Sequence, residues 1–294
     1  MDLTRRRALA ALASPAVAGT APGGGLPKVR IGGREFSRLI VGGNPVSGNS
    51  HQPGGASREM RDYFTAENTK KMLRACEEAG INTWQSRGDR HILRLLNEYR
   101  LEGGRLQWVA QTASELADIP RNIRECAAAG AAGVYHHGSA TDKFWNSGKI
   151  ERVRDLLKVM RDAGVLAGIG THIPEVVDYV ESKNWDFDFH MTSIYNLSRP
   201  REEAAKLAGK AVDGELFWDP DREAMLRRVR QASKPCFIFK VYAAGRKCGS
   251  RGEMLDALRL VFRYAKPNDA VVLGMFPKYK EQVRENCDLL EKCV

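Results

Sequence analysis

The stretch DIPRNIRECAAAGAAGVYHHG (residues 118–138) changes from a helical pattern to a strand pattern within a few residues. Apolar residues recur at helical spacing as far as Ala129-Gly130, where glycine supplies the left-handed residue that ends many helices. The apolar run 132–137 that follows predicts a short buried strand. A helix that leads directly into such a strand is the repeating unit of α/β folds.

The same unit recurs from residue 38 onward, and Ala79-Gly80 and Ala163-Gly164 mark the same helix-to-strand step. Eight strands alternating with helices predict an α/β fold, a (β/α)8 TIM barrel, in one domain over residues 28–294. KVRIGGREFSRL (28–39), with Gly32-Gly33 at its turn, predicts a β-hairpin that closes the bottom of the barrel. The predicted strands are 38–43, 81–86, 106–111, 132–137, 165–170, 187–193, 236–243 and 270–275.

The first residues have the pattern of an export signal. Thr4-Arg5-Arg6-Arg7 precedes the weakly apolar stretch ALAALASPAVA (8–18), which predicts a cleavable twin-arginine signal peptide over residues 1–18. The alternative is a basic tail. We expect an exported, periplasmic protein, and no stable membrane insertion, because the apolar stretch is too short to span a bilayer.

The charge and the cysteine spacing of the chain limit the kinds of ligand that we expect it to bind. The net charge is +10, but basic and acidic residues alternate along the helices and form no dense basic block, which argues against nucleic-acid binding. A small-molecule substrate, including an anionic one, fits this charge better. Six cysteines occur without a CxxC pair, so no zinc-ribbon or thioredoxin pattern is present. Disulfide pairing and oligomeric state stay open.

Five short segments follow one another along the chain in a fixed order: RLIVGG (38–43), EEAGIN (77–82), YNLSR (195–199), YAAGR (242–246) and GM…EQVREN (274–286). In this order and spacing they resemble the aldo/keto reductases over residues 28–294. The resemblance implies a barrel enzyme that reduces carbonyl compounds with NADP.

The resemblance also implies a catalytic tetrad of Asp, Tyr, Lys and His, from which this chain departs. The first three positions hold Gln85, Arg90 and Thr112, and only the histidine persists, as His137 or His136. Without the tyrosine acid the family's carbonyl reduction lacks its proton donor. At the positions where the family binds its cofactor, Tyr195, Lys278, Gln282 and Asn286 match and imply NADP. At the positions that hold the nicotinamide, this chain has Thr171-His172 and Thr192 instead.

Histidines gather at the ends of three successive predicted strands. His137, His172 and His190 are candidate ligands for a divalent metal such as Zn, Mn or Fe, because barrel strands end on one face and imidazole suits these ions. A carboxylate such as Asp142 is a candidate fourth ligand. Because neighbouring side chains in a strand alternate, His136 and His137 cannot both point inward. The alternative is a set of neutral histidines without metal.

Lys240 interrupts the apolar run CFIFKVYA (236–243). A lysine that points into a barrel is costly unless it is paired or loses its proton, and such a lysine acts as a base, forms a Schiff base or holds an anion. The alternative is a lysine that points outward to the helices. Arg246 and Arg90 are candidate cations near the strand ends.

Three functions follow from these candidates. The first is metal-assisted proton transfer of isomerase, epimerase or lyase type on a small carbonyl, polyol or sugar-like compound. It uses His137 and Lys240, with Gln85 and Arg90 nearby. The second is an NADP-dependent oxidoreductase with an unusual tetrad. The third is a ligand-binding barrel without catalysis.

Overall fold

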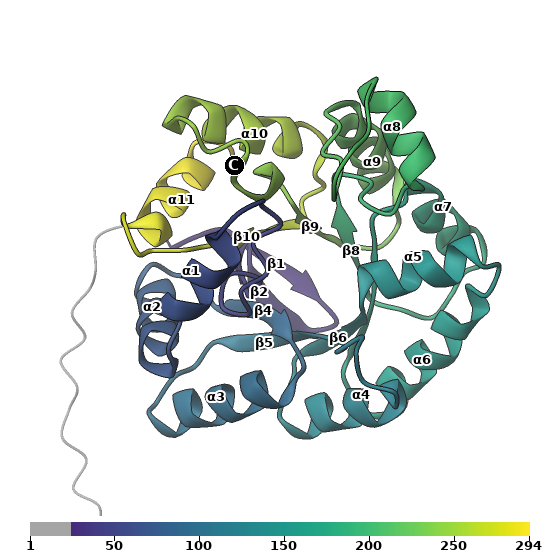
Figure 1. The fold of residues 1–294 in the computed structure, drawn as a ribbon. Coiled ribbons are helices and arrows are strands. Elements are labelled where there is room, and N and C mark those ends of the chain that lie inside the picture. Colours follow the sequence, from purple (N-terminus) through teal and green to yellow (C-terminus); the bar gives the residue numbers. More distant parts are fainter. Residues whose placement is uncertain (1–24) are drawn as a thin grey trace, which may run out of the picture.

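The computed structural model describes residues 25–294, so the predicted signal peptide and the expected periplasmic location stay predictions. Eight parallel strands close into a barrel with helices outside it, which confirms the predicted TIM barrel (Figure 1). The order around the barrel is β10-β3-β4-β5-β6-β7-β8-β9. The strands are β3 (Leu39–Gly42), β4 (Thr83–Arg87), β5 (Gln107–Gln111), β6 (Gly133–His136), β7 (Leu166–Thr171), β8 (Phe189–Ser193), β9 (Cys236–Phe239) and β10 (Ala270–Gly274).

Alternating side chains of the strands serve two separate cores. Val109, Tyr135 and Phe189 point into the barrel and pack together, whereas Trp84 and Trp108 point outward against the helices. Both faces are buried, which explains why the strands appear in the sequence as continuous apolar runs. Only every second residue of a strand, on the side of Val109, Tyr135 and Phe189, therefore points into the barrel.

The predicted hairpin forms and closes the N-terminal end of the barrel. Its strands are β1 (Lys28–Ile31) and β2 (Arg34–Ser37), and Figure 1 shows them across the centre of the ring of helices. Val29 and Phe36 join the inner core. Asn82, just before β4, donates a hydrogen bond to the Glu35 carbonyl at 3.0 Å. Because this end is plugged, a ligand must enter from the opposite end.

Eleven α-helices are present in the described residues. Three short ones, α1, α5 and α8, have no apolar stripe that would predict a helix from the sequence. α1 buries no residue, and α8 buries only Ala204. α5 buries Gly138, Thr141 and Asp142, none of which is a large apolar residue. The helices are α1 (Ala56–Tyr63), α2 (Ala66–Glu78), α3 (Arg90–Leu101), α4 (Ile119–Ala128), α5 (Gly138–Asn146), α6 (Glu151–Asp162), α7 (Pro174–Ser182), α8 (Arg201–Ala208), α9 (Pro220–Gln231), α10 (Arg251–Tyr264) and α11 (Gln282–Glu291).

Two further observations concern the described part of the chain. None of its helices is long and apolar enough to cross a membrane. All six cysteines lie within it and are unbridged, four of them buried.

Candidate active site

The C-terminal ends of the barrel strands form the mouth of the barrel, and two cavities open there. We name them by their central residues. The lysine cavity measures about 440 Å³ and the histidine cavity about 350 Å³. The lysine cavity is lined among others by Asn44, His51, Glu59, Met60, Gln85, Phe239, Lys240, Tyr242, Val272, Phe276 and Gln282.

Lys240 reaches its cavity through a break in the backbone. The predicted strand 236–243 is too long, because β9 ends at Phe239 and Lys240 takes a left-handed conformation with φ 65°. Strand alternation would have turned Lys240 outward with Ile238, but this residue instead lines the cavity. Ala243 and Ala244 also have positive φ, of 50° and 54°. Non-glycine residues rarely adopt this conformation, and such strain is concentrated at functional sites.

The amine of Lys240 is buried without a hydrogen-bond partner among the described residues. Its Nζ lies 5.5 Å from the centre of the Phe217 ring. Burial, with a smaller contribution from Arg246, lowers the pKa of Lys240 to about 7, whereas Glu215 opposes the shift. Near neutral pH the amine is therefore free in a large share of molecules.

A set of hydrogen bonds holds the loops around this lysine together. His51 Nδ1 lies 2.8 Å from a Glu215 carboxylate oxygen, and Arg246 donates to the His51 carbonyl at 2.9 Å. Gln52 donates to the Ala244 carbonyl at 2.6 Å. These bonds join the segment after β3, the segment before α9 and the turn after β9. No sequence pattern marks Glu215, so its part in the site was not predicted.

His172 and Asp142 form a buried pair on the other side of the mouth. The Nδ1–H of His172 donates to Asp142 at 2.7 Å. The same carboxylate accepts hydrogen bonds from Thr171 Oγ1 and Ser198 Oγ, both at 2.6 Å. Asp142 is held by these donors, and in turn it fixes the orientation of the imidazole. Nε2 of His172 makes no hydrogen bond within the described residues, so its lone pair is available to a ligand.

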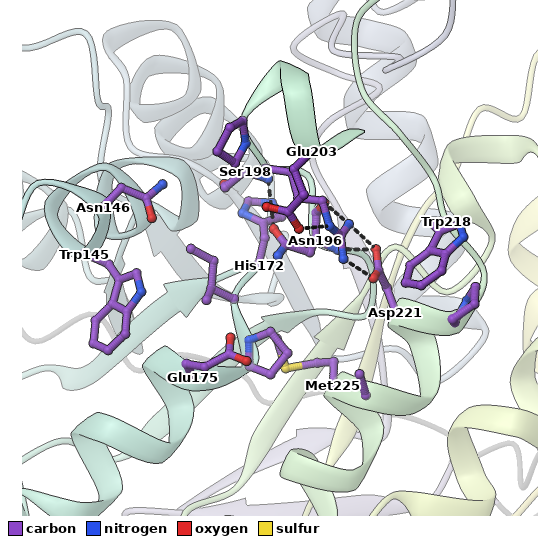
Figure 2. Close-up of a pocket in the computed structure, with 16 residues that line it drawn as sticks. Trp145, Asn146, His172, Glu175, Asn196, Ser198, Glu203, Trp218, Asp221 and Met225 are labelled. Atoms are coloured by element: carbon purple, nitrogen blue, oxygen red, sulfur yellow. Dashed lines mark hydrogen bonds and ion pairs between the residues drawn. The ribbon is translucent and has the colours of Figure 1, made fainter. Parts of the chain in front are cut away.

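The histidine cavity lies beside this pair. Figure 2 shows Trp145 and Trp218 at opposite sides of it, with His172 between them. Arg199 in its wall is neutralised by Asp221, with 2.7 Å between one pair of their atoms. Other lining residues are Glu175, Asn196, Glu203 and Met225.

Residues of both cavities influence the pKa of Glu215. Burial alone would raise the pKa of this carboxyl, but His51, Lys240 and His172 together lower it. The His172 ring also packs edge-on against Phe239, with 5.6 Å between ring centres. Lys240 and His172 thus line two separate cavities of the same mouth, with Phe239 of the lysine cavity in contact with the His172 ring.

The remaining histidines have other surroundings. His190 is fully buried, faces the helices and lies 2.9 Å from Glu181. His136 also points outward, with Nδ1 2.8 Å from Thr141 Oγ1. His137 lies at the mouth near His172, and burial lowers its pKa to about 4.

The structure therefore brings His137 and His172 together but not His190. The part of the chain from residue 25 onward holds no group of three or more His, Cys, Asp or Glu side chains able to hold a metal ion. The divalent metal stays a prediction without such a ligand set.

The other two predicted catalytic residues, Gln85 and Arg90, lie in different places. Gln85 is buried, lines the lysine cavity and donates to the Tyr135 hydroxyl at 2.9 Å. Arg90 is exposed at the start of α3 and lines a different, outer depression beside Asp118. Gln85 thus belongs to the site, whereas Arg90 does not line either cavity of the mouth.

The predicted cofactor residues mainly hold the protein together. Tyr195 is buried, and its hydroxyl donates to Asp219 at 3.1 Å. Lys278 pairs with Glu59 at 2.7 Å. Asn286 accepts a hydrogen bond from the Tyr242 hydroxyl at 2.9 Å. Of the four cofactor residues only Gln282 lines the lysine cavity, and NADP stays a prediction that nothing in the structure tests.

No protein-family model and no curated protein match this chain. Among solved structures, a truncated 3-deoxy-D-arabino-heptulosonate 7-phosphate synthase from Thermotoga maritima shares 11% identity over 91% of each chain, with a TM-score of 0.52. A mutant tryptophan synthase α-subunit from Pyrococcus furiosus shares 13% identity, over 86% of this chain and 96% of that one, with a TM-score of 0.49. At this identity the likeness shows the barrel fold alone.

The expected membership of the aldo/keto reductases is therefore wrong. No family model matches this chain, and the similar barrel from Thermotoga maritima is a synthase and not an aldo/keto reductase. The five segments that carried the resemblance are short and lie in strands, in the turn after a helix or in the loops that follow strands, which every closed α/β barrel has. They predict the architecture and not the family.

Proposed function

We propose that the protein is an enzyme acting on a small carbonyl compound at the barrel mouth, where the amine of Lys240 forms an imine with the substrate. The observation that carries this proposal is the Lys240 amine itself, buried without a partner at the edge of a cavity and held there by a strained turn. In other enzymes desolvation activates lysines for this chemistry.

The step balances without any further reagent. The free amine adds to the carbonyl carbon, its two protons pass to the carbonyl oxygen, and water leaves as the C=N bond forms. A proton from solvent then gives the protonated imine. The protonated imine withdraws electrons from the neighbouring carbon. A C–C or C–H bond at that carbon then breaks more easily, which gives a lyase or an isomerase reaction.

His172 supplies the proton transfer in this proposal. Because Nδ1–H is donated to Asp142, Nε2 carries the lone pair and acts as the base. The buried Asp142 also stabilises the imidazolium that forms when Nε2 takes a proton. A base and an amine on opposite sides of one mouth are the minimum that imine chemistry needs.

Borohydride trapping tests this proposal. The protein is incubated with a neutral ketone, reduced with sodium borohydride, digested, and analysed by mass spectrometry for a modified peptide. We expect the modification on Lys240 and its loss in Lys240→Met. Lys247→Met is the matched control, because Lys247 lies seven residues further along and pairs with Asp219 at 2.9 Å outside the cavity.

The outcomes separate the proposed function from a ligand-binding barrel. A barrel without catalysis would bind carbonyl compounds and give no reduced adduct. Labelling that is equal in Lys240→Met and in the wild type would overturn the assignment of the amine.

A further inference from the structure

We infer that the substrate is a neutral carbonyl compound with an apolar body about the size of an aromatic ring, and that it carries no phosphate or carboxylate. This inference deepens the proposed function and rests on it, because it assumes that the reacting carbonyl lies at Lys240. The lining of the lysine cavity beyond that residue carries it.

The walls away from Lys240 are mostly apolar. Phe239 ends β9, Val272 lies in the middle of β10 and Phe276 follows that strand, whereas Met60 comes from α1. Phe276 also packs edge-on against Tyr63, with 5.3 Å between ring centres. Cavities of roughly 300–1,000 Å³ with such walls bury most of a drug-sized ligand, and this cavity of about 440 Å³ falls in that range.

Charged groups that would hold an anion are missing from this lining. Lys240, Glu59 and His51 are the Lys, Arg, His, Asp and Glu side chains among the cavity residues that the structure describes, and His51 Nδ1 is already held by Glu215 at 2.8 Å. Glu59 is already occupied by Lys278 at 2.7 Å and by the Tyr279 hydroxyl. Lys240 must be uncharged in order to attack a carbonyl. A phosphate on the substrate would therefore be buried without a cationic partner, which is costly.

The nearest guanidinium is engaged elsewhere. Arg246 donates to the carbonyls of His51 and Ala243, and it covers the Phe217 ring at 4.1 Å. It does not line the cavity. An anionic substrate could recruit it only by breaking the bonds that hold the mouth together.

Amide oxygens remain for neutral polar groups on the substrate, among them those of Gln85 and Asn44. Gln85 uses its Nε2 to donate to Tyr135, and Asn44 uses its Nδ2 toward His51, 3.3 Å away. Their Oε1 and Oδ1 atoms make no hydrogen bond within the described residues. Each can accept a hydrogen bond from a hydroxyl group. The cavity thus fits an aryl or alkyl ketone or aldehyde that carries one or two hydroxyls.

Competition between two carbonyl probes tests the inference on the full protein. The probes are 4-phenylbutan-2-one and dihydroxyacetone phosphate, and the readout is the rate of borohydride-trapped adduct on Lys240. We expect the neutral ketone to react faster by about tenfold or more, since a buried unpaired anion costs well over the 1.4 kcal/mol that a factor of ten represents. Equal or faster trapping of the phosphate compound would overturn the inference and leave the Lys240 imine intact.

A second measurement does not depend on imine formation. Equilibrium binding of 4-phenylbutan-2-ol and of glycerol 1-phosphate, neither of which has a carbonyl, is measured by calorimetry. Tighter binding of the phenyl alcohol supports the inference, and tighter binding of the phosphate overturns it. If no probe gives an adduct but the alcohol binds, the proposed function fails while the apolar character of the cavity stands.

Met60→Lys and Met60→Gln form a matched pair. Lysine adds a cation to the apolar wall, whereas glutamine adds only polarity at similar length. We expect Met60→Lys alone to increase trapping of dihydroxyacetone phosphate. An increase of the same size in Met60→Gln would contradict the argument from charge.

Discussion

The reactivity of the Lys240 amine should depend on pH in a way that ordinary lysines do not show. Burial lowers its pKa from the usual 10.5 to about 7. At pH 7 about half of this amine is then free, against on the order of one in 3,000 for an ordinary lysine amine. The expected excess of free amine is thus on the order of a thousandfold.

The assay is reductive methylation with formaldehyde and cyanoborohydride between pH 5.5 and 9, followed by peptide mass mapping. Formaldehyde is small and neutral, so it can enter the lysine cavity. Since only the free amine reacts, labelling of Lys240 should rise with pH, reach half of its maximum near pH 7 and level off above about pH 8. An amine at the ordinary value keeps gaining free fraction over the whole range.

A substitution at Glu215 checks the sign of the electrostatic contribution. Its carboxylate favours the charged form of Lys240, whereas Arg246 and burial disfavour it. Glu215→Gln should therefore move the labelling midpoint to lower pH, by up to about one pH unit. A midpoint above about pH 9, or a folded protein in which Lys240 is never labelled, would refute the reasoning on desolvation.

Three further predictions concern stability, each measured by urea unfolding. Asp142→Ala should lower the free energy of unfolding by about 3–5 kcal/mol, because several buried donors lose their acceptor, whereas Asp142→Asn should cost less. Gly168→Ala should cost about 1–3 kcal/mol, since its Cβ would lie 2.4 Å from the Phe189 ring inside the barrel. The control Gly252→Ala, whose Cβ would meet only one atom at 3.8 Å, should be neutral or stabilising. For Glu181, burial raises the pKa but hydrogen bonds from His190 and two neighbours lower it to about 2. Its stabilising effect should be complete above about pH 4.5 and be lost as the pH falls toward 2. Glu181→Gln should flatten that part of the stability curve, and an unchanged curve would contradict the role given to these hydrogen bonds.

Much of the barrel could be predicted because its signals are local. Apolar runs and glycine-ended helices located all eight strands, and the Gly32-Gly33 turn located the hairpin. The prediction of a family failed because the five short segments on which it rested lie in strands, turns and loops that any closed barrel has. The helices α1 and α8 escaped prediction since they bury almost nothing and so show no apolar stripe.

For the site, the sequence by itself determined which residue types follow the barrel strands at their C-terminal ends. Strand ends follow from periodicity, and His172 and Lys240 follow predicted strands or lie within them. The tertiary structure alone decided which of these side chains meet. His190 occupies a strand position whose side chain points toward the helices, where it meets Glu181. Lys240 reaches the cavity because the backbone takes a positive φ directly after Phe239.

The partners of these residues were beyond the reach of the sequence for the same physical reason. Asp142 lies 30 residues from His172 along the chain, and Glu215 lies 164 residues from His51, yet each pair is within hydrogen-bond distance. Local patterns determine strands and helices because their hydrogen bonds and alternation involve near neighbours. The pKa of an amine depends on what surrounds it in space, and closure of the barrel brings those groups together.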